Sequence, residues 1–338
     1  MKKSLKYSLL SLTTLTAIIV TSLSVGLSVN NASIKPKDNN YKNHLQTKKE
    51  ENVYLKQLAD EFFFNSELTD NFKNDYFNNQ NNINDNYFNE LNVALTYAPF
   101  PVVHLLEIAK DIKIKYARQS VEIFENLLTN NWYWYLTNLD SFLYQFNPFN
   151  SKYKDNKDDK GKDTKEIQKE FEELFNKNEL FYKIKNTDIT GYKTFEIPNL
   201  KQDVYTNKKI GFLKVSNNVL IPFFTYTNEK KENIIMITPD LFVFNKEIED
   251  TTIKNIADLF ISLRQERIDS DIAYFKKISS SGQYDENEVY KTYDDKTLFQ
   301  IFNKNNYSEL FFKELFRFNQ LDNDIKFKRF TWGFNEKK

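Results

Sequence analysis

The sequence contains no cysteine and only two histidines, His44 and His104, which stand far apart in its 338 residues. The lack of cysteine excludes disulfides, thiolate catalysis, zinc–thiolate sites and the lipid-modified cysteine of a bacterial lipoprotein. Without cysteine or a pair of histidines, zinc and haem have no obvious ligands. We therefore expect no metal and no cofactor.

Glycine is also scarce, with six residues scattered along the chain. Their spacing excludes the G-x-G-x-x-G dinucleotide fingerprint and the Walker phosphate loop, and the G-x-S-x-G elbow of serine hydrolases is absent. Catalysis would then depend on paired carboxylates, for which the sequence offers Asp269/Asp271, Asp285/Glu286/Glu288 and Asp294/Asp295. Charged residues make up 28% of the chain, so such clusters also arise by chance. We identify no catalytic residue and do not expect an enzyme.

An excess of charge of either sign is missing too, because Lys plus Arg and Asp plus Glu both total 47. A chain without an excess of basic residues lacks the positive charge that is typical of nucleic-acid-binding proteins, and we expect no nucleic-acid partner. Asp155, Asp159 and Glu166 have the spacing of a calcium loop. However, Lys157 and Lys160 stand where that loop needs an oxygen ligand and a tight turn.

Large aromatic residues, in contrast, are abundant. They make up 16% of the sequence and include 31 Phe and 20 Tyr. Part of this excess reflects AT-rich codons, so aromatic content alone is weak evidence for binding. The 40% hydrophobic content is enough for a buried core in a chain of this length.

The N-terminus carries an apolar run. Lys2, Lys3 and Lys6 precede the uncharged residues 7–34, which are rich in Leu, Ile and Val. About 20 apolar residues suffice to cross a bilayer, and a positive flank stays in the cytoplasm. We expect residues 1–34 to be a signal peptide or an N-terminal membrane anchor, and residues 35–52 to be a polar tether. The remainder then lies on the extracellular face of the cell membrane, or is secreted if the run is cleaved.

The densest aromatic segment, residues 131–149, holds two of the three tryptophans. Its apolar side chains recur at helical spacing and predict one helix with a continuous apolar stripe. The stripe consists of Trp132, Tyr135, Leu136, Leu139, Phe142, Leu143 and Phe146. Pro148 ends the predicted helix, because proline disfavours a helical conformation in the residue before it. We interpret Trp132, Tyr135, Leu136, Leu139, Phe142 and Phe146 of this stripe, together with Pro148, as the structural core of the motif.

The opposite face of this predicted helix is more polar. It carries Tyr133, Thr137, Asp140, Ser141 and Tyr144 at steps of three or four residues. One interpretation is a core helix whose aromatic side chains all pack against neighbours. The other is a groove for a cation, a lipid headgroup or a sugar. The groove hypothesis makes Tyr133, Trp134, Thr137, Asp140 and Tyr144 the candidate ligand-binding residues.

Hydrophobic periodicity predicts an α+β fold, with an α-rich N-terminal half and, in the C-terminal half, a small antiparallel meander with flanking helices. Residues 53–150 form the α-helical region with the aromatic motif, in which 102–128 and 132–147 pair as a long helical hairpin. Residues 151–165 are a mixed-charge linker. Residues 166–334 are the α+β region.

Local patterns predict several individual elements. Short β-branched and aromatic runs separated by turn residues predict strands at 209–215, 219–227, 234–238 and 241–244. Pro222 argues for an edge strand or a bulge in the second run. Residues 250–252 are expected to cap a helix, and 325–334 to form a closing strand with a bulge. Upstream, 53–63 predicts a short helix and the Asn-rich stretch 71–86 a loop.

The aromatic segment resembles the signature of the aromatic motif membrane protein family described from mycoplasmas. The residues that carry the resemblance are Asn131 to Leu136, Asn138, Leu139, Phe142, Phe146, Pro148 and Phe149. The apolar N-terminus and the codon-biased composition agree with it. The resemblance implies a membrane-associated protein exposed on the surface of a wall-less bacterium, and it brings no catalytic role.

The leading hypothesis is therefore an extracytoplasmic, membrane-associated surface protein. It would bind or adhere through its aromatic-rich helix to a host macromolecule, a lipid or a neighbouring surface protein. One alternative is a structural subunit of a cell-surface complex, whose aromatic stripe docks another protein. The other is a surface hydrolase that works with a pair of carboxylates.

Overall fold

The computed structural model describes much of the chain that follows the N-terminal apolar run. The described residues are 51–64, 69–81, 83, 91, 123–124, 126–146, 169, 172–201, 203–278, 285–292 and 325–333. They belong to the second of two compact units, Met1–Lys48 and Lys49–Lys338. The expected anchor, the charged linker and most of the 102–128 helix lie outside the described residues. Within the described part, no helix is both long and apolar enough to cross a membrane.

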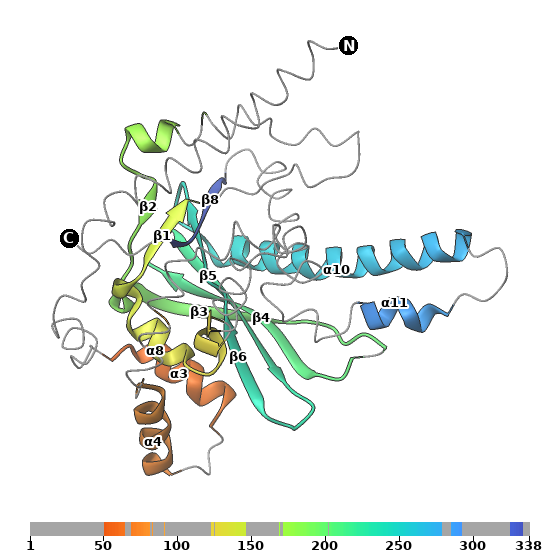
Figure 1. The fold of residues 1–338 in the computed structure, drawn as a ribbon, viewed down its shortest axis with the longest axis horizontal. Helices are drawn as coiled ribbons and strands as arrows, with labels where there is room; N and C mark the ends of the chain where they lie inside the picture. The colour runs from red at the N-terminus through yellow and green to blue at the C-terminus, as the bar shows by residue number, and fades with distance from the viewer. Residues whose placement is uncertain are drawn as a thin grey trace, which may run out of the picture. The chain divides into compact units, whose positions relative to one another are not determined.

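One antiparallel sheet of eight strands organises the second unit (Figure 1). The strands follow the order β2-β1-β8-β7-β5-β4-β3, and β6 pairs with β5 as well. Their bounds are β1 (Leu143–Phe146), β2 (Phe181–Tyr182), β3 (Ile189–Glu196), β4 (Thr206–Val215), β5 (Val219–Thr227), β6 (Asn233–Ile237), β7 (Asp240–Phe244) and β8 (Phe327–Gly333). Residues from the aromatic segment and from near the C-terminus thus lie side by side in one sheet.

The described helices are α3 (Val53–Phe62), α4 (Asp70–Asn81), α8 (Trp132–Thr137), α10 (Asp250–Ile278) and α11 (Glu286–Thr292). They cover both faces of the sheet. On one face the Phe260 ring of α10 packs 6.1 Å from the ring of Phe224 in β5. On the other face Tyr192 of β3 donates a 2.8 Å hydrogen bond to Glu61 of α3. Because both faces are covered, β5 is buried over nearly its whole length, and β4 is buried from Ile210 to Leu213.

Strands β6 and β7 form one broken strand along β5. From Leu220 to Phe223 the chain advances three residues, whereas their partners Phe242 and Ile237 are five apart. The extra residues lie opposite Pro222, whose carbonyl accepts hydrogen bonds from the N–H (3.0 Å) and hydroxyl (2.9 Å) of Thr238. Proline has no N–H to donate, so it fits where the ladder is interrupted. The expected irregularity at Pro222 therefore exists, but β5 is an interior strand and the bulge is in its partner.

Helix α3 is attached to the sheet by its N-cap residue, Asn52. The Asn52 side-chain oxygen accepts hydrogen bonds from the N–H groups of Tyr54 and Leu55. Its amide nitrogen donates to the carbonyls of Asn186 (2.8 Å) and Ile189 (3.0 Å) at the start of β3. One buried amide thus satisfies the helix start and joins it to a distant strand.

The expected α-rich N-terminal half with a helical hairpin is wrong, because the described residues form a large antiparallel sheet with a few helices. Residues 132–147 do not form one helix: α8 ends at Thr137, a 3-10 turn follows at Leu139–Ser141, and β1 pairs with both β2 and β8. The N–H of Asn138 and its side-chain amide close the last turn of α8 on the carbonyl of Trp134. Phe142 then adopts an extended conformation. The backbone N–H and C=O groups at the end of an isolated helix lack hydrogen-bond partners, whereas residues 143–146 find such partners in β8.

The expected small meander is also wrong in extent. The predicted strands at 209–244 match β4 to β7 closely, but β1, β2, β3 and β8 widen the sheet to eight strands. The closing strand β8 exists, and its pairing with β7 runs in continuous register from Phe327 to Thr331, so it has no bulge there. A sheet that draws strands from such distant segments cannot be read from local periodicity.

The expected loop at 71–86 is a helix, α4, over Asp70–Asn81. Asparagine is a poor helix former, which is why the sequence predicts a loop. In the structure, Phe72, Tyr76 and Phe77 of α4 all lie with their rings edge-on to Phe64. These tertiary contacts override the local propensity. The helices predicted at 53–63 and after residue 250 are present as α3 and α10.

Gly211 in β4 provides a test of the packing between strands. An added Cβ would lie 2.2 Å from Cζ of Phe223, the residue directly opposite in β5. Phe223 is fully buried, and a close-packed protein interior leaves little free volume into which its ring could shift. We expect Gly211→Ala to lower the free energy of unfolding by about 1–3 kcal/mol through overpacking, measured by urea denaturation.

The matched control is Gly191→Ala in β3, where an added Cβ meets nothing within 4 Å. We expect it to change stability by no more than about 0.5 kcal/mol. Shortening the neighbour, in Gly211→Ala/Phe223→Leu, should cost less than the two single changes added together. Equal losses for the two glycine variants would contradict a steric role for Phe223.

Candidate functional site

Aromatic rings from α4, from α8 and from the two residues that follow α3 pack against one another on one face of the sheet. We call this group the aromatic cluster; its members are Phe63, Phe64, Phe72, Tyr76, Phe77, Trp132 and Tyr133. Trp132 stacks on Phe63 with a centroid distance of 6.1 Å and an interplanar angle of 7°. Tyr133 lies 4.5 Å from Phe77. The cluster joins α4 to α3 and α8, and both α3 and α8 also contact β6 of the sheet.

Polar groups orient the rings of the cluster. The indole N–H of Trp132 donates a 2.9 Å hydrogen bond to the Tyr76 hydroxyl. Gln80 accepts from the N–H of Tyr133 (3.2 Å) and donates to the carbonyl of Asn130 (2.6 Å). Burial raises the pKa of Tyr76 to about 12, and the Trp132 hydrogen bond opposes that rise. Burial, with the charge of Glu51, also raises the pKa of Tyr133 to about 12, so both hydroxyls stay protonated at neutral pH.

A second set of aromatic contacts ties α8 to the sheet. The hydroxyls of Tyr135 in α8 and Tyr144 in β1 lie 2.6 Å apart, and both residues are fully buried. The Phe142 ring stands edge-on to Tyr135 at 5.1 Å and to Trp134 at 6.4 Å. The short helix is therefore held from the sheet side as well as from α4.

The structure does not bring the five candidate ligand-binding residues onto one exposed face. Tyr133, Trp134, Thr137 and Tyr144 are buried, whereas Asp140 is exposed. The Thr137 hydroxyl donates to the carbonyls of Tyr133 (2.9 Å) and Trp134 (3.0 Å) within its own helix. Tyr144 lies in β1 and not in a helix. The common helical face on which the groove was predicted is absent, and ligand binding by these residues stays a prediction.

The structure describes all but one of the residues predicted to form the core of the motif. Trp132, Tyr135, Leu136, Leu139, Phe142 and Phe146 are all buried. Pro148 lies outside the described residues. Beyond α8, Phe146 contacts Phe330 of β8 at 5.7 Å, so the aromatic contacts continue into the sheet.

The carboxylate pairs considered for catalysis lie on the surface of α10 and at α11. Gln265 donates to Asp269, and Lys276 forms a 3.4 Å ion pair with Glu286. Asp294 and Asp295 lie outside the described residues. Within the part of the chain that the structure describes, no group of three His, Cys, Asp or Glu residues is placed to hold a metal ion. The absence of catalysis stays a prediction.

A buried ion pair that sequence reasoning missed joins β7 to β8. The Arg329 Nε donates a 2.7 Å hydrogen bond to Asp240, whose side chain is 1% exposed. Burial raises the pKa of Asp240, while the charge and hydrogen bond of Arg329 oppose the rise. A second buried pair, Lys208 with Asp203, lies before and at the start of β4. Both ion pairs lie within or beside strands and serve the fold.

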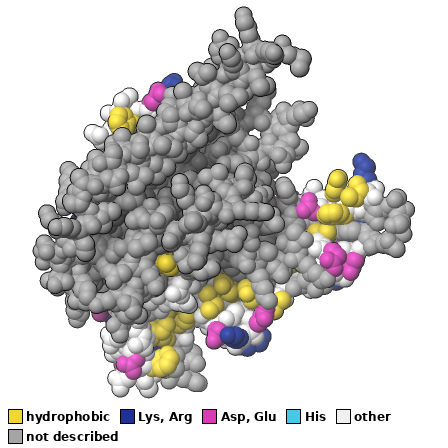
Figure 2. Space-filling model, in the orientation of Figure 1, with side chains coloured by type: hydrophobic (Ala, Val, Ile, Leu, Met, Phe, Trp, Pro, Cys, Tyr) yellow, Lys and Arg dark blue, Asp and Glu magenta, His cyan; other side chains and the backbone are white. Residues whose placement is uncertain are grey.

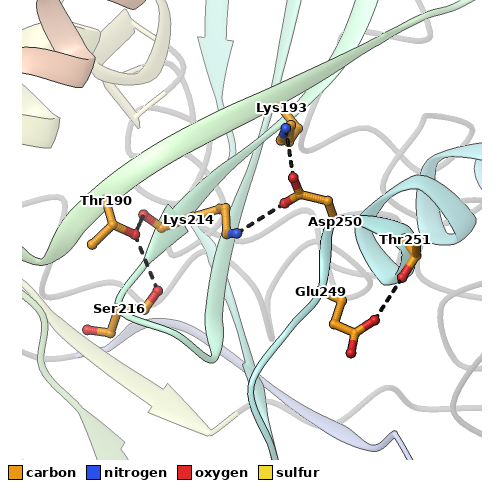
Figure 3. Close-up of polar contacts among 7 residues, drawn as sticks. All are labelled: Thr190, Lys193, Lys214, Ser216, Glu249, Asp250 and Thr251. Carbon is orange, nitrogen blue, oxygen red and sulfur yellow. Dashed lines mark hydrogen bonds and ion pairs between the residues drawn. The ribbon is translucent and has the colours of Figure 1, made fainter.

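The start of α10 is fixed by a surface ion network (Figure 3). Asp250, the first residue of the helix, accepts from Lys193 of β3 (2.8 Å) and Lys214 of β4 (3.1 Å). Hydrogen bonds from Lys193 and then Lys214 lower the pKa of Asp250. The carboxylate expected to cap the helix thus also binds the sheet. Because all three side chains are partly exposed, the network contributes modestly to stability.

Comparison with known proteins identifies the family. The model of the aromatic cluster surface protein family matches residues 30–279, well over half of the chain. No curated protein and no solved structure matches. The matched range includes the whole aromatic cluster and strands β1 to β7. The chain belongs to the aromatic cluster surface protein family.

Proposed function

We propose that this surface protein is displayed outside the membrane, tethered by its N-terminal apolar run, and that it acts by binding or adhesion without catalysing a reaction. Support for the location comes from the family and from the lysines that precede the uncharged residues 7–34. Support for binding comes from large apolar side chains exposed on the described surface. These are Val53, Phe72, Phe175, Phe181, Val204, Tyr274, Phe275 and Ile278.

The exposure of these apolar side chains is the observation that carries the binding proposal, whereas the aromatic segment is buried. Trp132 and Tyr135 are fully buried, and their polar atoms are hydrogen-bonded to Tyr76 and Tyr144. Buried side chains whose polar atoms are hydrogen-bonded within the protein stabilise the fold and do not need a ligand to complete their hydrogen bonds. The segment therefore supports a rigid scaffold, and contacts with a host macromolecule or a neighbouring surface protein come from other surfaces.

The test is fractionation of cells, protease treatment of the intact cells, and mass spectrometry of the N-terminus. We expect the chain in the membrane fraction, cleaved by external protease, with residues 1–34 retained. The control variant Leu15→Lys/Ile18→Lys, which breaks the apolar run, should stay in the cytosol and be protected. If the chain were released from the cells without residues 1–34, it would be a secreted protein and not an anchored one. Wild-type chain protected in the cytosol would refute surface display.

A further inference from the structure

The side chain of Lys208 is enclosed in the protein together with a carboxylate. It forms an ion pair with Asp203, and the two side chains are 0% and 3% exposed. Lys193 and Lys254 also pair with carboxylates, but their side chains are 45% and 61% exposed. Figure 2 shows basic and acidic side chains beside one another on the described surface in the same way. Lysine is among the residues that are least often buried, so Lys208 differs in kind from these surface lysines.

An irregularity at the start of β4 directs Lys208 into the interior. Between Thr206 and Lys209, β4 contains one residue more than the facing part of β5, which makes a β-bulge. Asn207, inside the bulge, has a φ of 52°, in the left-handed region that few residues other than glycine adopt. Lys208 follows it and, at a step of two, shares the strand face of the fully buried Ile210. The strand is therefore shaped locally around a buried amine.

The Asp203 carboxylate is held by the turn that precedes β4. The backbone N–H of Leu200 donates to Oδ2 of Asp203, the same oxygen that contacts Lys208. In return, the N–H of Asp203 donates to the carbonyl of Leu200 (3.2 Å). The Leu200 side chain packs on an apolar cluster formed by α10 and α11 (Figure 1). The amine and the carboxylate thus meet in a fixed arrangement with almost no access to water.

We propose that Nζ of Lys208 and Cγ of Asp203 form an isopeptide bond. A proton first passes from the ammonium group to the carboxylate, which leaves a neutral amine and a carboxylic acid. The amine attacks Cγ, a C–N bond forms, and the C–O bond to the protonated oxygen breaks. That oxygen leaves as water with a second proton from the nitrogen, and the amide nitrogen keeps the third. The reaction needs no oxidant, reductant or other reactant.

Several physical effects favour the amide over the ion pair. Groups that are held aligned in contact react with an effective concentration of about 10⁵–10⁸ M. Two enclosed charges lose their hydration, and the reaction removes this cost because the amide is neutral. The Leu200 N–H stabilises the negative charge that develops on the carboxyl oxygen during the attack. Exclusion of water then protects the product from hydrolysis.

The test is mass spectrometry of the purified full chain, shown by circular dichroism to be folded, then denatured and digested with trypsin. Trypsin cleaves after lysine, and the sequence offers Lys201, Lys208 and Lys209 as cleavage sites. An amide on Lys208 blocks cleavage there. We therefore expect the peptide 202–209, lighter by one water molecule and without fragment ions from single backbone breaks between 203 and 208.

Two variants and one internal control accompany the wild type. Lys208→Arg retains the positive charge but has no amine, so it should release the peptide 202–208 at its full mass. Asp203→Ala removes the carboxyl group and should also restore cleavage after Lys208. The exposed pair of Lys254 with Asp258 is the internal control, because its groups are hydrated. Trypsin should cleave after Lys254 in the same digest.

The other outcomes contradict the proposal. A folded wild-type chain that releases the peptide 202–208 at its full mass would refute the isopeptide bond. A loss of water that persists in Lys208→Arg would overturn it as well, because it would assign the loss to ring closure of Asp203 on its own backbone. A loss of water at the exposed pair too would show that enclosure of the charges is not the cause.

Discussion

Replacing Trp132 with alanine is expected to lower the free energy of unfolding by about 3–5 kcal/mol. Trp132 is fully buried, stacks on Phe63 and donates to the Tyr76 hydroxyl. Its removal leaves a cavity between α3, α4 and α8 and takes the hydrogen-bond donor away from Tyr76. Urea denaturation followed by circular dichroism measures the loss.

Two further variants test whether the loss of stability depends on the burial of the replaced ring or only on its being aromatic. Trp134 is 4% exposed and contacts Phe142, so Trp134→Ala should cost nearly as much as Trp132→Ala. Phe72 belongs to the aromatic cluster but is 52% exposed, so Phe72→Ala should cost no more than about 1 kcal/mol. Unchanged stability in Trp134→Ala would contradict its structural role and favour the ligand groove.

Replacing Arg329 with methionine is expected to cost about 3–5 kcal/mol, because it leaves the Asp240 carboxylate buried without its cationic partner. The double variant Asp240→Leu/Arg329→Met removes both charges and should regain most of this loss. Lys254→Met, which breaks an exposed ion pair with Asp258 on α10, is the control and should cost at most about 0.5 kcal/mol. If the losses of Arg329→Met and of a single Asp240→Leu variant simply add in the double variant, the two side chains have no energetic coupling, which would contradict this account.

The Arg329 variant also has a predicted pH dependence. Arg329 opposes the rise that burial causes in the pKa of Asp240. Without it, the folded-state pKa rises further above the value in the unfolded chain. The protonated Asp240 carboxyl then stabilises the folded state at low pH, and this stabilisation is lost as the pH rises through the folded-state pKa. The stability deficit of Arg329→Met relative to wild type should therefore narrow as the pH falls, and a deficit that widens would refute the account.

The candidate site was predictable in composition but not in geometry. The sequence singles out Trp132 and its neighbours, and the family match covers the same segment. It does not reveal that Phe63, Phe64 and Tyr76 complete the cluster, because they lie in segments with weak or misleading local signals. The buried Asp240–Arg329 pair carries no local signal either, since its partners meet only when β7 pairs with β8.

The sequence by itself determined α3, α10 and the strands β4 to β7, because each is bounded by turn residues and built on one clear period. Only the tertiary structure decided residues 132–146. Phe142, Tyr144 and Phe146 satisfy a period of two, and Phe142 and Phe146 also fall on the predicted helical stripe, so local spacing supports both a helix and a strand. The choice depends on β8, far downstream, whose backbone pairs with residues 143–146. Long-range hydrogen bonding, which no local pattern encodes, therefore divides the aromatic segment between a helix and the sheet.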